Sequence, residues 1–237
     1  MKKLLVGCGG LVGLVVVIAV IMNATGGSGS SQSPNTNGSS SPSSSSGGSA
    51  TAATTTPTPA KVATRKVTGT ATTLGAGTFT GGKDLAVGLY DVTAGAGQSG
   101  NFIVSGTDSY DEILGDPSAG GVPKVRAQIS AGDSIQISGL SSVTFTPVTT
   151  PFVTTHTATN LYAGTFTVGQ DIGAGRYVAT PGTGQSGNFI VSGSDSYDEI
   201  LGGSSADGGV PSLTVTLTNG DIIDISGLSQ VTLTPSS

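Results

Sequence analysis

The chain has 237 residues, a net charge of −5 and only 10% charged residues. Nine lysines and arginines against fourteen acidic residues leave no electrostatic basis for binding nucleic acid. The single cysteine, Cys8, cannot form a disulfide within the chain and leaves no thiol chemistry elsewhere. The composition therefore excludes a nucleic-acid-binding protein and a disulfide-rich secreted domain.

The N-terminal segment predicts a membrane anchor. Residues 4–22 carry no charge, are dominated by Leu, Val and Ile, and follow Lys2 and Lys3. As a helix they would span roughly 28 Å, which is about one hydrocarbon core. Because basic residues resist translocation, we expect a cytoplasmic tip at 1–3 and a transmembrane helix at 4–22. The protein would then be a single-pass cell-membrane protein with an extracellular C-terminus.

Two other interpretations of this segment stay open. It could be a cleaved signal peptide, although no A-x-A site follows the apolar run. Cys8 could be lipidated, because LVGC at residues 5–8 looks like a lipobox, although a lipobox normally closes an apolar run and this one opens it.

Residues 23–66 are predicted to be a disordered stalk. Up to residue 60 this segment consists of Ser, Gly, Thr, Pro, Ala and Asn with one Gln, and it has no charge and no aromatic side chain. Such a composition cannot bury enough apolar surface to offset the entropy of ordering. A flexible tether of this length reaches on the order of 35 Å.

The remaining sequence consists of two copies of one repeat. Residues 98–115 read QSGNFIVSGTDSYDEILG, and residues 185–202 repeat them with only Thr107 replaced by Ser194. The motifs AGTFT, GGVP, GD-x-I-x-ISGLS and VT-x-TP also recur. A period of roughly ninety residues is too long for a solenoid repeat and long enough for a small domain. We therefore expect β module 1 at 67–147, a linker at 148–160 and β module 2 at 161–237.

Alternating side chains predict strands in both copies. Leu213, Val215 and Leu217 alternate with threonines, and residues 125–129 repeat the pattern with Val, Ala and Ile. Period-two alternation with β-branched residues is typical of half-buried strands. The Phe-Ile-Val runs at 102–104 and 189–191 predict strands buried on both faces. We expect an all-β fold of two tandem small antiparallel β-sandwich or jelly-roll-like modules. The ISGL glycines, Gly139 and Gly227, are expected at positive φ.

The motifs TVGQDIGAGRY at 167–177 and GD-x-I-x-ISG at 132–139 and 220–227 resemble a repeat of uncharacterised cell-surface proteins from Gram-positive, lactobacillus-like bacteria. The first copy departs from the opening pattern, reading TGGKDLAVGLY at 80–90. The resemblance implies a surface location and a β fold. It implies no activity.

Catalytic motifs are missing from the sequence. The only histidine, His156, lies in the expected linker and is interpreted as a solvated side chain. There is no HExxH or CxxC motif, and no helix follows the Gly-rich stretches, so phosphate binding is unsupported. We therefore predict a protein that is not an enzyme and has no cofactor and no metal.

One acidic block is the candidate site. It comprises Asp108, Tyr110, Asp111 and Glu112 and recurs as Asp195, Tyr197, Asp198 and Glu199. Ser109 and Glu112 have the spacing of a capping box, which predicts a single helical turn through Ile113 and Leu114 that ends at Gly115. Alternatively the three acids could collect a hard cation, or the block could form a contact patch for sugar or protein.

Two functions follow as hypotheses. The first is a membrane-anchored surface protein that displays two β modules for structural, adhesive or ligand-binding purposes, with cell-wall glycan or a surface protein as partner. The alternative is a hydrolase or other secreted enzyme acting on wall polymers, which would use paired carboxylates across a cleft. Clustering of the acids in one short segment per copy favours the first.

Overall fold

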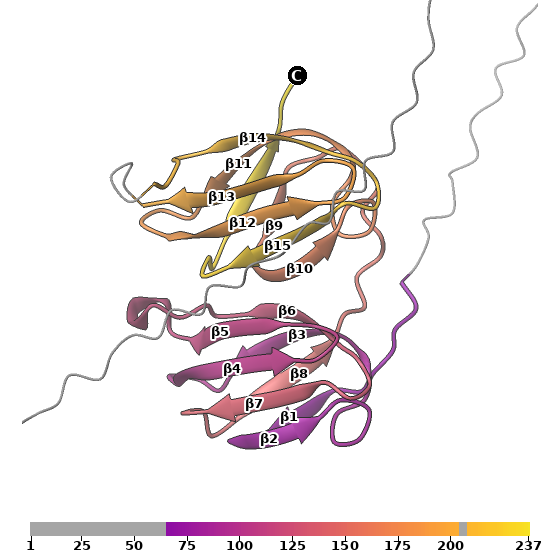
Figure 1. Ribbon diagram of the computed structural model, residues 1–237, viewed down its shortest axis with the longest axis vertical. Helices are drawn as coiled ribbons and strands as arrows, with labels where there is room; N and C mark the ends of the chain where they lie inside the picture. The colour runs from indigo at the N-terminus through magenta and orange to yellow at the C-terminus, as the bar shows by residue number, and fades with distance from the viewer. Residues whose placement is uncertain (1–64, 204–207) are drawn as a thin grey trace, which may run out of the picture. The chain divides into compact units, whose positions relative to one another are not determined.

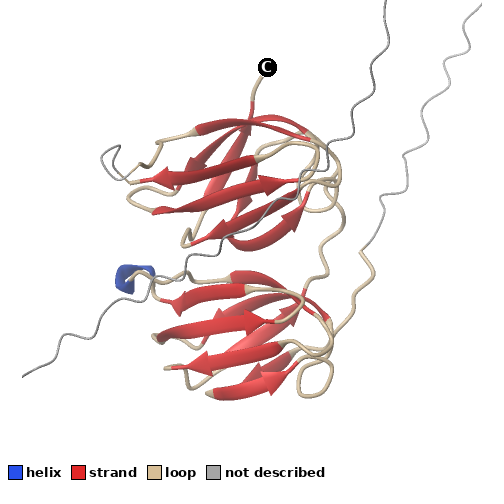
Figure 2. Ribbon diagram, viewed as in Figure 1, coloured by secondary structure: helices blue, strands red, loops and turns tan. Residues whose placement is uncertain are grey.

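The computed structural model describes residues 65–203 and 208–237 of the chain (Figures 1 and 2). The predicted tip, the apolar span 4–22, Cys8 and nearly all of the stalk lie outside the described residues. Among the described residues, no helix is long and apolar enough to cross a membrane. Their only regular helix is a 3₁₀ turn at Pro117–Ala119, so the all-β prediction is confirmed for them.

The first half of the described region contains eight strands. They form the strand orders β1-β8-β3-β6 and β2-β7-β4-β5, and every neighbouring pair within these groups is antiparallel. Their bounds are β1 Thr72–Leu74, β2 Gly77–Thr80, β3 Gly88–Ala94, β4 Ser99–Ser105, β5 Tyr110–Gly115, β6 Val125–Ile129, β7 Ser134–Ser138 and β8 Val143–Pro147.

The second half repeats this arrangement strand for strand. Its orders are β9-β16-β11-β14 and β10-β15-β12-β13, which are the first-half orders with eight added to each number. The duplicated sequence therefore produces a duplicated pairing scheme (Figure 1). The bounds are β9 Thr159–Leu161, β10 Ala163–Thr167, β11 Gly175–Pro181, β12 Ser186–Ser192, β13 Tyr197–Gly202, β14 Leu213–Leu217, β15 Ile222–Ser226 and β16 Val231–Pro235.

The two halves share one sheet. Strand β6 of the first half pairs in parallel with β10 of the second, which places Val125 beside Ala163 and Arg126 beside Gly164. This pairing creates an eight-stranded sheet in addition to two four-stranded ones. Gly164 permits the contact, because a Cβ atom at its φ of +116° would lie 2.1 Å from the Arg126 carbonyl oxygen. A larger residue there would force the two strands apart.

Each half has its own hydrophobic core. The predicted alternation is confirmed, because Val125, Ala127 and Ile129 are buried in the first core and Val215 and Leu217 in the second. Fully burying a Val, Leu or Ile side chain contributes roughly 1.5–3 kcal/mol. Two separate buried clusters therefore stabilise the two halves, and the β6–β10 contact joins them.

The helical turn expected in the acidic block is wrong. Residues 110–115 form strand β5, which pairs along its length with β4. Tyr110 and Leu114 are buried whereas Asp111 and Ile113 are exposed, which is the period of a strand. The capping-box spacing is a local preference, and pairing with β4 outweighs it.

Two further sequence predictions have different outcomes. The Phe-Ile-Val strands are not buried on both faces, because Ile103 and Ile190 are only half-buried while their neighbours point into the cores. The prediction for the ISGL glycines is confirmed, since Gly139 and Gly227 have φ values of +74° and +71°.

Candidate functional site

The first aspartate of the acidic block ties its loop to a neighbouring turn. Asp108 accepts a hydrogen bond from the Ser130 hydroxyl at 2.8 Å, and Asp195 accepts one from the Thr218 hydroxyl at 3.0 Å. Burial raises the pKa of Asp108, although the Ser130 hydrogen bond opposes the shift and the nearby charge of Asp133 adds to it. In both copies this aspartate therefore accepts a hydrogen bond from the hydroxyl group at the matching position.

The tyrosine accepts a hydrogen bond from one backbone N–H group of a nearby strand in each half. The Tyr110 hydroxyl oxygen accepts a hydrogen bond from the Gln128 N–H on β6, and Tyr197 accepts one from the Thr216 N–H on β14, both at 3.0 Å. Burial raises the pKa of Tyr110. A strand N–H group is satisfied in this way in both halves.

The aspartate of the GD-x-I-x-ISG motif is a buried residue that sequence reasoning passed over. Asp133 is fully buried and accepts hydrogen bonds from the backbone N–H groups of Thr107 and Ser130, at 2.8 and 2.7 Å. Its counterpart Asp221 makes the same two contacts in the second half. The repeated Gly-Asp pair was the available signal, because a buried carboxylate must be hydrogen-bonded.

Glu112 reaches from the first half to the second. Its two carboxylate oxygens lie 3.1 and 3.2 Å from the Gly227 backbone nitrogen, which donates to them. Burial raises the pKa of Glu112 to about 7, with the Gly227 N–H lowering it and the charge of Asp111 raising it. Glu199, the matching residue, is half-buried.

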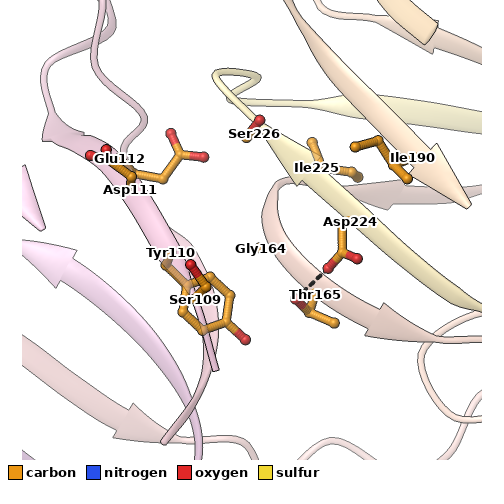
Figure 3. Close-up of a pocket in the computed structure, with 10 residues that line it drawn as sticks. All are labelled: Ser109, Tyr110, Asp111, Glu112, Gly164, Thr165, Ile190, Asp224, Ile225 and Ser226. Carbon is orange, nitrogen blue, oxygen red and sulfur yellow. Dashed lines mark hydrogen bonds between the residues drawn. The ribbon is translucent and has the colours of Figure 1, made fainter. Parts of the chain in front are cut away.

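A cleft of about 190 Å³ lies where the two halves meet. Figure 3 shows Asp111 and Glu112 on one side of it and Thr165 and Asp224 on the other. The Thr165 hydroxyl donates a hydrogen bond of 2.6 Å to Asp224. The cleft is lined by residues 109–112 of the first half and by Gly164, Thr165, Ile190, Asp224, Ile225 and Ser226 of the second.

Two identical polar and aliphatic surfaces border this cleft. In the first half, Ile103 is paired with Asp111 and Asn101 with Ile113 across β4 and β5, and all four side chains point away from the core. Ile113 is 46% exposed. We call these four residues outer patch 1.

The second half presents the same four residue types. Ile190 is paired with Asp198 and Asn188 with Ile200 on β12 and β13, and Ile200 is 40% exposed. We call them outer patch 2. Asp111 of patch 1 and Ile190 of patch 2 both line the cleft, so the two patches meet there.

A buried ionic cluster holds the halves together beside the cleft. Arg126 forms salt bridges with Asp171 at 2.6 Å and with Asp91 at 3.1 Å, and it donates a hydrogen bond to the Tyr162 hydroxyl at 2.8 Å. Arg65 adds a second salt bridge to Asp171 at 2.7 Å. Desolvation lowers the pKa of Arg126, but Tyr162 and the two aspartates outweigh this and raise it overall. Sequence reasoning placed Arg126 on a polar strand face and missed the cluster.

His156 is exposed but makes definite contacts. Its Nε2 atom lies 2.8 Å from the Arg176 carbonyl oxygen, and its ring packs edge-on against Tyr177 with 4.5 Å between centroids. The prediction of a solvent-exposed histidine in the linker is confirmed, and these contacts add to it. The local role is packing at the start of the second half.

The acidic block does not gather its carboxylates around one point. In the described ranges no group of three or more His, Cys, Asp or Glu side chains could hold a metal ion. Asp108 and Glu112 instead have the separate partners given above, and Asp111 is exposed. No family model, curated protein or solved structure matches the chain.

Proposed function

We propose that this chain is a membrane-anchored extracellular surface protein whose two β modules display contact surfaces for adhesion or ligand binding. In each half the order 1-8-3-6 opposite 2-7-4-5 is the order expected of an eight-stranded jelly roll, so we interpret the halves as tandem jelly-roll sandwiches. The apolar span 4–22, the low-complexity stalk and the resemblance to Gram-positive surface repeats support the location.

The observation that carries this proposal is the recurrence of the outer patch. Asp108 and Tyr110 and their counterparts are occupied by structural hydrogen bonds, which explains why they recur. Asp111 and Ile113 have no such role in the core, yet their counterparts are identical and are also exposed. An exposed isoleucine with carboxylate and amide neighbours is typical of an interface centre with a polar rim.

The chemistry of the patch favours a protein partner over a glycan. Its four side chains are two isoleucines, one asparagine and one aspartate, with no aromatic ring for a sugar to stack on. Because one chain carries the patch twice, its binding to a surface that repeats the ligand would also be stronger than that of a single patch. We therefore propose a repeated surface protein as the partner.

The test compares two double variants of fragment 57–237, which is one compact unit of the chain. Ile113→Lys/Ile200→Lys places a charge in both outer patches. Val67→Lys/Val87→Lys is the matched control, because these valines are similarly exposed, at 47% and 42%, and lie elsewhere. Binding of labelled fragment to bacterial cells is measured before and after the cells are treated with protease.

We expect saturable binding that falls at least tenfold in the patch variant, stays unchanged in the valine variant, and is lost from protease-treated cells. Equal binding by the two double variants would show that the outer patches do not contribute to binding. Binding that survives protease and is competed by purified wall material would replace the protein partner with a glycan.

A wall-polymer hydrolase is the second candidate, because Glu112 lines the cleft together with two other acidic residues. Its pKa of about 7 with Asp111 and Asp224 nearby resembles the acid and base pairs of glycosidases. The Gly227 N–H group already donates to both Glu112 oxygens, which argues against a role for Glu112 as a catalytic acid. Release of soluble sugar that Glu112→Gln abolishes would establish it.

A further inference from the structure

We propose that the molecules associate head to tail, with β14 of one chain docking on β2 of a second copy in the same way as β6 docks on β10 within the chain. This inference goes beyond the binding function, since it names a second copy of this chain as the occupant of two open edges. It rests on the internal junction, which shows how these surfaces fit together.

The internal junction joins two unlike surfaces. The first half contributes strands β5 and β6, which we call the donor surface, and the second half contributes β10, β12 and β15, the acceptor surface. Because the halves are duplicates, a second donor surface exists on β13 and β14 and a second acceptor surface on β2, β4 and β7. In the described residues, β2 pairs only with β7 and β14 only with β11, so both edges are open.

The open surfaces have kept the residues that line the cleft of the junction. Nine of the ten residues that line the internal cleft recur at the matching open positions, and the one change is Asp224 to Gln136. The open donor surface repeats Ser-Tyr-Asp-Glu at 196–199. The open acceptor surface repeats Gly77, Thr78, Ile103, Ile137 and Ser138.

The acceptor surface inside the junction is more buried than the open acceptor surface. Ala163 and Phe166 on β10 are 0% and 1% exposed. Of their counterparts, Ala76, just before β2, is exposed and Phe79 on β2 is only half-buried. Gly164 admits the Arg126 backbone, and its counterpart Gly77 is still glycine, with a φ of +155°. An exposed edge with this shape is a template for a further strand.

The ionic cluster is the part that does not recur. Thr214, Val178 and Gly75 stand where Arg126, Asp91 and Tyr162 stand in the junction. Only Asp84 is retained, as the counterpart of Asp171, and both accept the same backbone hydrogen bond at 2.8 Å. The contact between molecules therefore lacks the buried salt bridges and is weaker than the contact within one. Since the two surfaces are unlike, each copy in a pair keeps one donor or acceptor surface free, so the association continues beyond a dimer.

Disulfide trapping tests this geometry directly in the full chain, kept in detergent micelles and carrying Cys8→Ser so that no native thiol remains. Ala76 and Leu213 match the paired residues Ala163 and Val125, and neighbouring strands bring Cα atoms within disulfide range. Ala76→Cys and Leu213→Cys are made as separate single variants. On oxidation, we expect the mixture of the two to give cross-linked dimers and either variant alone to give few.

A chain that carries both cysteines should give a ladder of multimers. Cross-linking of each single variant with itself as fast as with the other would contradict the head-to-tail arrangement. Monomers alone in the mixture, at concentrations up to the millimolar range, would overturn the proposal.

Four further variants in the cross-linking mixture separate this contact from random collision. Thr78→Lys on the exposed β2 edge should reduce the rate at least fivefold. Thr73→Lys, on the exposed β1 edge, is the matched control and should leave it unchanged. Thr214→Arg restores the missing arginine opposite Asp84 and should raise the rate severalfold, and adding Asp84→Asn should cancel that gain. Equal rates for all of these variants would overturn the proposal, whether or not the outer patches bind a ligand.

Discussion

Arg126 donates a hydrogen bond of 2.6 Å to Asp171, and the two residues belong to different halves of the duplicated sequence. Thr214 stands at the position of Arg126 in the second half and is exposed. The loss of Arg126, together with its partners Asp91 and Tyr162, thus distinguishes the open edge of β14 from the buried junction at β6. The relationship also shows that the two copies are alike in fold and different in what they contact.

Arg126→Met should destabilise fragment 57–237 by about 2 kcal/mol. Breaking a buried ion pair typically costs about 3–5 kcal/mol, and the cost is reduced here because Asp171 keeps its salt bridge to Arg65 and Asp91 is partly exposed. Thr214→Met, the matched change on the open strand, should stay within about 0.5 kcal/mol. Urea unfolding monitored by circular dichroism measures both, and equal effects would show that the cluster does not stabilise the junction.

Gly164→Ala should cost clearly more than Gly220→Ala. Both glycines have positive φ, so both substitutions carry the backbone penalty of about 1–2 kcal/mol. Only at Gly164 would the added Cβ also meet the Arg126 backbone, at 2.1 Å, whereas nothing lies within 4 Å of it at Gly220. Thermal melts of the two variants compare them, and the same loss in both would mean that β6 and β10 are not in close contact.

Stability should fall as pH rises from about 4.5 to about 7 because of Glu112. The carboxyl ionises near its ordinary pKa of 4.5 in the unfolded chain, but only near 7 in the folded protein. Between these values the unfolded state binds fewer protons, so the free energy of unfolding decreases with pH and then levels off above 7. The full shift corresponds to about 3 kcal/mol at most.

The contribution of Glu112 is isolated by comparing Glu112→Gln with Glu199→Gln, its counterpart in the second half. The pH dependence of unfolding between 4.5 and 7 should be much flatter in Glu112→Gln and should persist in Glu199→Gln. A profile unchanged by Glu112→Gln would show that its carboxyl is not buried against Gly227.

Asp133→Ala should destabilise the fragment by about 2–4 kcal/mol, because two buried backbone N–H groups lose their acceptor. Asp111→Asn, on the exposed face of β5, should change stability by no more than about 0.5 kcal/mol. Denaturant titration of both variants shows which aspartate contributes more to stability. A larger effect at Asp111 would indicate a structural role for the outer patch.

The strands could be predicted because their signals are local. Alternation at residues 213–217 and at 125–129 follows directly from one buried face, and Gly139 and Gly227 need positive φ for their own turns. Strand β5 was misread because its first residues imitate a capping box, and only pairing with β4, which lies earlier in the chain, decides its conformation.

The candidate site could not be predicted from local sequence patterns, because residues far apart in the chain form it. Glu112 and Gly227 are 115 positions apart, and nothing in either sequence neighbourhood marks them as partners. Arg126 follows the alternation of an exposed position, but the second half covers that face of β6. Comparing the two copies offered the one usable hint, because Arg126, Asp91 and Tyr162 are replaced together in the other copy.

The central claim is that the duplicated block serves contact rather than chemistry. The most direct measurement incubates wild-type fragment 57–237 with intact bacterial surface material, and follows bound fragment and released soluble product in the same sample. We predict saturable binding that Ile113→Lys/Ile200→Lys reduces at least tenfold, with no product formed. Product that accumulates with time and disappears in Glu112→Gln would contradict the account and make the cleft an active site.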